Sequence, residues 1–226
     1  MTVDHLAHLE RDAEAFVAAL RSTDLDAPVA ACPEWALRDL AVHLGRVHRW
    51  AAGIVRTGER GAADAVAPAD ADLADWLADG AVDLLAALRL PERECWTFAG
   101  RGSSAFWVRR QALETAVHRV DAQRAGGAEE DPVPDDLAED GIDEVLEVML
   151  PRQVSLGRIA EPATGLTLVT GTTRQLGSVA PTAEVSGPAG AVLLLLWRRL
   201  PRTDPRLQVT GDAAALDSLL DVAVTP

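Results

Sequence analysis

Apolar side chains recur every three or four residues in four stretches of the first 125 residues. This spacing lines them up along one face of a helix, which can be buried against its neighbours. We therefore predict helices at residues 4–22, 33–57, 72–90 and 104–124. Pro33 is expected to be the first residue of the second helix, and Pro91 to end the third. The segment that contains Gly100, Arg101 and Gly102 is predicted to be a loop.

The pattern changes after residue 125. Residues 126–136 are rich in Gly, Pro and acidic side chains, which is typical of a linker. A further helix is expected at residues 136–150, ended by Pro151, and another from Gly187 and Pro188 to Pro201, with residues 191–197 apolar all round. We predict strands at residues 165–170, 175–179, 183–185 and 207–210, and a last short helix at residues 212–222. The second part of the chain is therefore expected to be a small α+β unit.

Charge limits the classes of partner. The net charge is −14, and nearly all of the excess lies in residues 1–150, which hold 14 Arg and 29 acidic residues. Such a surface repels phosphate groups, so we expect neither nucleic acid nor an anionic membrane as a partner. All 21 basic residues are Arg, which suggests a GC-rich genome and favours an actinobacterial source. Two cysteines, no long apolar segment and no basic leader at Met1 together favour a cytoplasmic protein.

Three residues on two of the predicted helices could form a metal site. Glu114 and His118 are four residues apart, so they share one helical face, and His43 lies in the second helix among the apolar residues Leu40, Val42, Leu44 and Val47. Two imidazoles and one carboxylate leave a coordination position open, which is typical of catalytic rather than structural zinc. The alternative is that these are polar surface residues that never meet, since Glu-x-x-x-His also arises as ordinary helix stabilisation.

Other polar residues and the two cysteines could lie near this site. Asp39 precedes His43 by one turn and Asp121 follows His118 by three residues, so each could orient an imidazole through the nitrogen not used for metal. Each could equally be an ordinary exposed acid. His48 lies about 140° round the helix from His43, and we interpret it as structural. Cys32 and Cys95 lack metal-ligand spacing and are interpreted as buried or incidental thiols.

Two arginines follow the apolar helix of the C-terminal part. Arg198 and Arg199 could extend to the surface, as arginines commonly do. Alternatively, one of them could turn back and bind a substrate carboxylate through two hydrogen bonds.

Several runs of residues resemble the actinobacterial mycothiol-dependent maleylpyruvate isomerase family. The runs are Cys32–Trp35, Asp39–Trp50, Arg109–Asp121, Asp140–Glu144, Ser186–Gly190, Leu193–Pro201 and Thr210–Asp212. They are spread over nearly the whole chain. The resemblance implies an α+β protein, with an N-terminal DinB-like four-helix bundle followed by a small C-terminal α/β domain likened to sterol carrier proteins. We expect a metal-binding bundle at residues 1–127, a linker and interdomain helix at 128–150, and the small domain at 151–226.

The resemblance also implies a site and a chemistry. His43, Glu114 and His118 would hold Zn²⁺ or another divalent metal, and a C-terminal arginine, Arg199 before Arg198, would act in catalysis. Mycothiol would be the thiol cosubstrate for the cis–trans isomerisation of maleylpyruvate or a similar small electrophile. Two alternatives remain: a mycothiol S-transferase in detoxification or secondary metabolism, and a non-catalytic metal-binding module. A monomer or weak dimer is expected.

Overall fold

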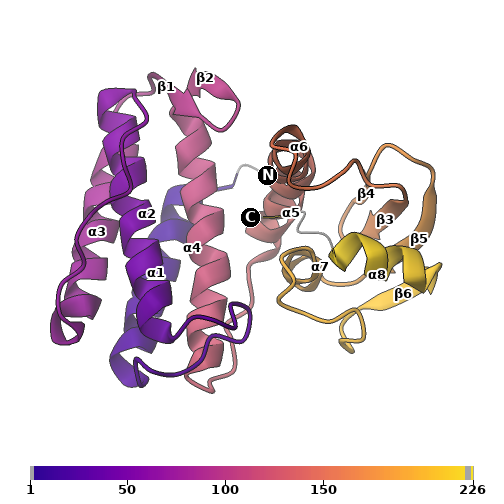
Figure 1. Cartoon of the computed structure of the whole chain (residues 1–226), viewed down its shortest axis with the longest axis horizontal. Coiled ribbons are helices and arrows are strands. Elements are labelled where there is room, and N and C mark those ends of the chain that lie inside the picture. Colours follow the sequence, from indigo (N-terminus) through magenta and orange to yellow (C-terminus); the bar gives the residue numbers. More distant parts are fainter. Residues whose placement is uncertain (1–2, 222–224, 226) are drawn as a thin grey trace. The chain divides into compact units, whose positions relative to one another are not determined.

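The computed structural model describes residues 3–221 and residue 225 (Figure 1). Contacts within the chain divide these residues into two compact units, which meet in sequence between Asp131 and Pro132. The first is helical with one small hairpin, and the second combines helices with a four-stranded sheet. The fold is thus a helical bundle followed by a small α/β domain, as predicted.

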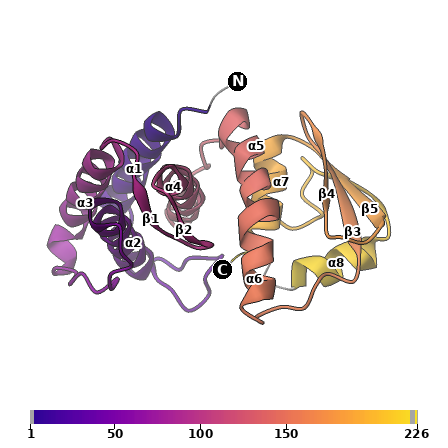
Figure 2. The same cartoon turned by 90° about the horizontal axis from the view of Figure 1, so that it is seen from above.

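Four α-helices form most of the first unit, and their bounds are α1 His5–Ser22, α2 Leu37–Thr57, α3 Leu73–Leu88 and α4 Ala105–Ala125; a short 3-10 helix, Asp70–Asp72, precedes α3. Helix α1 contacts α3 and α4, and α2 contacts the same two helices, so the four surround a common core (Figure 2). Phe16, Leu40, Leu44 and Leu77 are fully or almost fully buried in this core. Helices α1, α2 and α3 each bury one mostly apolar stripe, as the sequence indicates, whereas α4 is buried on nearly all sides between Arg110 and Ala122.

Helix α2 begins later than predicted. Pro33 is not helical, and the first helical residue is Leu37. The backbone folds into a turn before the helix, since the amide of Trp35 donates to the carbonyl of Cys32 and the amide of Val29 to the carbonyl of Trp35. The carboxylate of Asp39 then accepts a hydrogen bond from the amide of Ala36 at 2.9 Å. This contact satisfies a helix-start amide that would otherwise lack an acceptor.

The predicted loop around residue 100 is instead a β-hairpin. Strand β1, Glu94–Thr97, pairs antiparallel with β2, Gly100–Ser103. The hairpin is tied to the end of α2, because the amide of Trp96 donates to the carbonyl of Gly58. Gly58 itself has φ +81° and ends α2 in the left-handed conformation that glycine tolerates best. The prediction was wrong because Gly-Arg-Gly carries no alternating apolar pattern.

The second unit contains a sheet of four strands in the order β4-β3-β5-β6. Strands β3 and β5 are parallel, while β4 and β6 run antiparallel to their neighbours. The strand bounds are β3 Gly165–Val169, β4 Thr173–Leu176, β5 Pro181–Ser186 and β6 Gln208–Gly211. Helix α7, Ala189–Leu196, is buried on all sides, and α8, Ala213–Asp221, contacts β5. The end of the last predicted helix, at Val222, lies outside the described residues.

Pro151 does not end its helix. Helix α5, Asp135–Glu144, passes through one π-helical turn, Val145–Met149, into α6, Leu150–Ser155. In the π turn the amide of Leu150 bonds to the carbonyl of Val145, five residues back. A proline has no amide to donate and displaces the carbonyl four residues before it, so it is tolerated next to a turn whose hydrogen bonds are already shifted. The helix therefore continues past Pro151.

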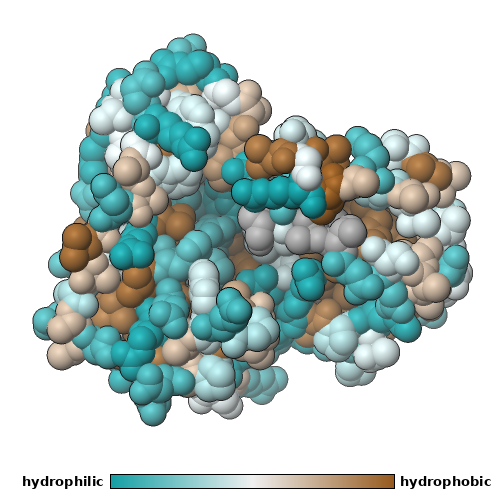
Figure 3. Space-filling model, in the orientation of Figure 1, coloured by the Kyte–Doolittle hydropathy of each residue, from teal (hydrophilic) through white to brown (hydrophobic). Residues whose placement is uncertain are grey.

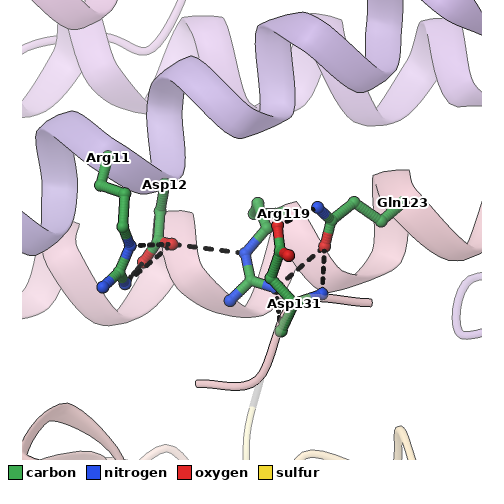
Figure 4. A network of polar contacts seen from close by, with 5 residues as sticks. All are labelled: Arg11, Asp12, Arg119, Gln123 and Asp131. Atoms are coloured by element: carbon green, nitrogen blue, oxygen red, sulfur yellow. Dashed lines mark hydrogen bonds and ion pairs between the residues drawn. The ribbon is translucent and has the colours of Figure 1, made fainter. Parts of the chain in front are cut away.

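A buried ion pair connects α1 with α4 (Figure 4). Asp12 and Arg119 are each 1% exposed, and the Nε of Arg119 lies 3.3 Å from Oδ1 of Asp12. Arg11 donates to the same carboxylate, and Arg119 also donates to the side chain of Gln123 and to the backbone carbonyl of Asp131. These partners offset much of the cost of burying the two charges.

Hydrophilic residues cover much of the helical unit on the face shown in Figure 3, where apolar side chains are scattered. Among the described residues, no helix combines the length and the apolar character needed to cross a bilayer.

Candidate metal centre

The three predicted ligands lie on the facing sides of two neighbouring helices. His43 is on α2, and Glu114 and His118 are one turn apart on α4. The side chain of His43 is 35% exposed, while those of Glu114 and His118 are 15% and 9% exposed. The ring of Trp35 lies against the imidazole of His43, with 5.0 Å between ring centroids. Two ligands are thus held inside the bundle, and the third is accessible at its surface.

The ligand atoms converge on one point. Oε1 of Glu114 lies 3.3 Å from Nε2 of His43 and 3.3 Å from Nε2 of His118. All three ligand atoms lie within 4.8 Å of one another. A tetrahedral zinc ion with ligand bonds of about 2.0–2.1 Å separates its ligand atoms by roughly 3.3 Å, so two of the three separations already match. The residues present therefore fit a divalent metal.

Asp121 fixes the imidazole of His118. Its Oδ2 lies 3.1 Å from Nδ1 of His118, and its carboxylate is 1% exposed. This contact places a proton on Nδ1, so Nε2 is the nitrogen that faces the candidate metal position. Burial alone would lower the pKa of His118, but the hydrogen bonds to Asp121 and Glu114 outweigh burial and raise the pKa to about 9. A metal must therefore displace a firmly held proton.

Glu114 remains ionised at this site. Burial acts to raise its pKa, but the charge of Arg110 and the hydrogen bonds to His118 and His43 hold the pKa well below its usual range. Arg110 is 3% exposed and its Nη2 lies 2.6 Å from Oε2 of Glu114. Arg110 was not predicted from the sequence to belong to the site. Its position one turn before Glu114 was the available signal, but such a pair is usually a surface ion pair.

The structure places Asp39 differently from Asp121. The carboxylate of Asp39 accepts a hydrogen bond from the amide of Ala36 at the start of α2, and Asp39 is exposed. Among the described contacts, none joins Asp39 to the imidazole of His43. The interpretation as a helix-start acid is therefore favoured over the orienting role.

His48 lies on α2 behind the site. It is fully buried, and its Nε2 lies 2.9 Å from Oγ1 of Thr115 on α4. Burial lowers its pKa to about 3, so the ring is neutral in the folded protein. This agrees with a structural role.

A pocket of about 620 Å³ opens beside His43. Its apolar wall is formed by Trp35, Val42, Val47, Trp50 and Ala63, and its charged side chains are Glu34, Asp39 and Arg46. Because His43 is part of the lining, a small molecule in this pocket can reach the candidate metal position. Of the pocket residues, His43 was predicted from the sequence as a metal ligand and Asp39 as a residue that could orient it.

The predicted catalytic arginines belong to the second unit. Arg198 is exposed and adopts φ +60°, an unusual conformation for a residue with a side chain. Arg199 is half-buried, and its Nη1 donates to the carbonyl of Trp197 at 2.8 Å. Their role in catalysis stays a prediction. Cys95 is buried, which raises the pKa of its thiol, and Cys32 is half-buried.

Comparison with known proteins gives the family. A sequence profile described as the mycothiol maleylpyruvate isomerase N-terminal domain matches residues 6–123, and the profile of the C-terminal domain of that protein matches residues 136–218. The comparison with curated proteins gave no match. Crystal structures of the mycothiol-dependent maleylpyruvate isomerase and of its histidine-to-alanine mutant are similar in fold, with TM-scores of 0.71 and 0.70. Each is 14% identical and aligns over 92% of this chain and 93% of the other. Because the two profiles match both units, the chain belongs to the mycothiol maleylpyruvate isomerase family.

Proposed function

We propose that this protein is a zinc-dependent enzyme that uses mycothiol to convert maleylpyruvate, or a similar electrophile, from the cis to the trans isomer. The observation that carries the proposal is the convergence of His43, Glu114 and His118 beside a pocket. The family supports it, since the solved structures of similar fold are of an enzyme described as mycothiol-dependent. Cys32 and Cys95 are not joined in a disulfide bond, which fits the proposed cytoplasmic location.

Each residue of the site has a defined task in this proposal. When bound, a zinc ion held by two imidazoles and one carboxylate supplies a Lewis acid that lowers the pKa of a thiol in its open position. Asp121 keeps the proton of His118 on Nδ1, away from the metal side. Trp35 packs against His43 and limits the rotation of its ring.

The chemistry of isomerisation needs a nucleophile that adds and then leaves. The thiolate sulfur bonds to one carbon of the double bond, and an electron pair moves to the carbonyl oxygen. The remaining single bond rotates, the electron pair returns, and the C–S bond breaks to release the trans product and the thiolate. A guanidinium, proposed to be that of Arg199 and otherwise Arg198, would bind the substrate carboxylate and the developing enolate.

The test uses the whole protein, freed of metal with a chelator and then reloaded with zinc. Absorbance of maleylpyruvate is followed with and without mycothiol, and the variant His43→Ala is the control. We expect conversion only when zinc and mycothiol are both present, and none with the variant. Conversion without thiol, or no conversion with both, would contradict isomerisation. A stable thiol adduct of maleylpyruvate or another electrophile would instead support S-transfer.

A further inference from the structure

Arg110 carries a positive charge in a buried position, where a charge without partners is unfavourable. Its side chain is 3% exposed, in the interior of the helical unit. Removing a guanidinium from water is costly unless ionic and hydrogen-bonding partners replace the water. Glu114, one turn further along α4, is such a partner, and the separation of Nη2 from Oε2 is 2.6 Å.

The two oxygens of Glu114 have different surroundings. Oε1 faces the Nε2 atoms of His43 and His118, each at 3.3 Å. Oε2 faces Arg110. A carboxylate can bind a metal through one oxygen or through both, and the second mode fills an additional coordination position. In this structure the second oxygen already has a charged donor.

We propose that Arg110 is a positioning residue that keeps Glu114 a one-oxygen metal ligand and so leaves the coordination position that a thiol needs. This inference rests on the metal-binding part of the proposed function. It adds a residue that touches neither metal nor substrate, and it assigns separate roles to Oε1 and Oε2.

The charges near the site support the same role. With a divalent metal in place, Glu114 and Asp121 contribute two negative charges and Arg110 one positive charge, so the group carries a net charge of about +1. Binding a thiolate then makes the buried group neutral. Without Arg110 the same state would carry an uncompensated negative charge in a buried site, which is costly.

A crystal structure of the zinc-loaded protein tests the inference without any substitution. We expect Oε1 of Glu114 at about 2.0–2.2 Å from zinc, and Oε2 still hydrogen-bonded to Arg110. Two equal zinc–oxygen distances, with Arg110 turned away, would overturn the inference while leaving the metal site intact. Zinc bound elsewhere would overturn the proposed function as well.

Cobalt substitution tests the same point in solution, because Co²⁺ absorbs visible light less strongly as its coordination number rises. At saturating cobalt, we expect Arg110→Met to lose visible absorption as the freed Oε2 joins the metal. Arg109→Met, the neighbouring arginine on α4, is the matched control and should retain the wild-type spectrum. Glu114→Gln offers only one oxygen, so adding Arg110→Met to it should change nothing further.

An Arg110→Met spectrum equal to that of the wild type would overturn the inference. An equal loss in the Glu114→Gln background would do so too, because the effect would then not pass through Oε2. If Arg110→Met does not fold, the crystal structure of the wild type decides.

Discussion

Gly45 on α2 lies directly against the indole ring of Trp76 on α3. A Cβ atom at residue 45 would stand 2.2 Å from Cζ3 of that ring, well inside van der Waals contact. Arg49 packs over the same ring, with its Cζ 4.0 Å from the ring centroid, and donates to the carbonyl of Gly45. The close approach of the helix that carries His43 to its neighbour therefore depends on the missing side chain.

Replacing Gly45 should destabilise the bundle. Gly45→Ala forces the Trp76 ring to move, and overpacking of this kind costs about 1–3 kcal/mol, which exceeds the gain in helix propensity. Gly53→Ala in the same helix is the control, because a Cβ at residue 53 meets nothing within 4 Å. That variant should gain about 0.5–1 kcal/mol. Urea unfolding of both variants measures the difference, and a shift of the same sign in both would refute the packing argument.

Removing either candidate histidine ligand should abolish stable metal binding. We expect about one zinc per wild-type chain after dialysis, as implied by a single three-ligand site, and almost none for His43→Ala or His118→Ala. His8→Ala on α1 is a matched control and should keep its zinc. Mass spectrometry of the metal content checks this, and full zinc in both ligand variants would place the metal elsewhere.

Replacing Asp121 should weaken metal binding, whereas replacing Asp39 should lower only the stability of the fold. Asp121→Asn removes the anionic acceptor of the His118 proton, and loss of such a partner typically lowers metal affinity 10–100-fold. Asp39→Ala should leave metal affinity unchanged and lower the free energy of unfolding by about 1 kcal/mol, since it removes the acceptor of the Ala36 amide. Competition with a zinc-binding dye and thermal unfolding measure the two effects. Equal loss of affinity in both variants would restore the orienting role of Asp39.

His48 should make the metal-free protein less stable in mild acid. The folded protein holds the ring neutral, with a pKa of about 3, whereas the unfolded chain takes up a proton near pH 6.5. Stability from this group is therefore complete above pH 6.5 and falls as the pH drops toward 3. The charged groups that act on its pKa besides burial are Glu114, which raises it, and Arg49, His118 and His43, which lower it.

The variant His48→Gln isolates this contribution. Between pH 6 and pH 4 its unfolding free energy should fall less steeply than that of the wild type, by up to about 1.4 kcal/mol per pH unit. Urea unfolding in the presence of a chelator at several pH values gives the two slopes. Parallel slopes would mean that His48 is not kept neutral by folding.

Arg199 should affect turnover and not metal binding. If it binds the substrate carboxylate, Arg199→Met lowers kcat/KM for maleylpyruvate at least tenfold, which corresponds to about 1.4 kcal/mol. Arg198→Met is the parallel variant, and the larger loss identifies the residue that contacts substrate. Zinc content should match that of the wild type in both. Unchanged kcat/KM in both would remove these arginines from the mechanism.

The sequence predicted the helices of the bundle well because their burial pattern is local. Helices α1, α2 and α3 each bury a stripe of residues three and four apart, and that spacing is visible in the sequence itself. The hairpin at Glu94–Ser103 was not predictable in this way, since Cys95 and Trp96 become strand residues only by pairing with Arg101 and Gly102. Pro151 was misinterpreted because the π turn before it leaves no signature in composition.

The candidate site, too, was predictable from the sequence only where it depends on local spacing. The sequence alone shows that Glu114 and His118 lie one turn apart on one helix. Their distance from His43 depends on how two helices pack. Arg110 was missed because its spacing from Glu114 is the same as in an ordinary ion pair on a helix surface. The spacing does not show that this arginine is buried. For Asp39 the sequence left two roles open, and the hydrogen bond from the amide of Ala36 favours the role at the helix start.

Arg119 makes the segment after α4 part of the bundle. Its guanidinium donates to the backbone carbonyl of Asp131, and Gln123 bonds both the amide and the carboxylate of that residue. Cutting the chain at Gly126 or Gly127 would keep all four helices and every candidate ligand. It would also leave the buried Arg119 charge with fewer acceptors. An excised bundle intended for metal-binding studies should therefore end beyond Asp131.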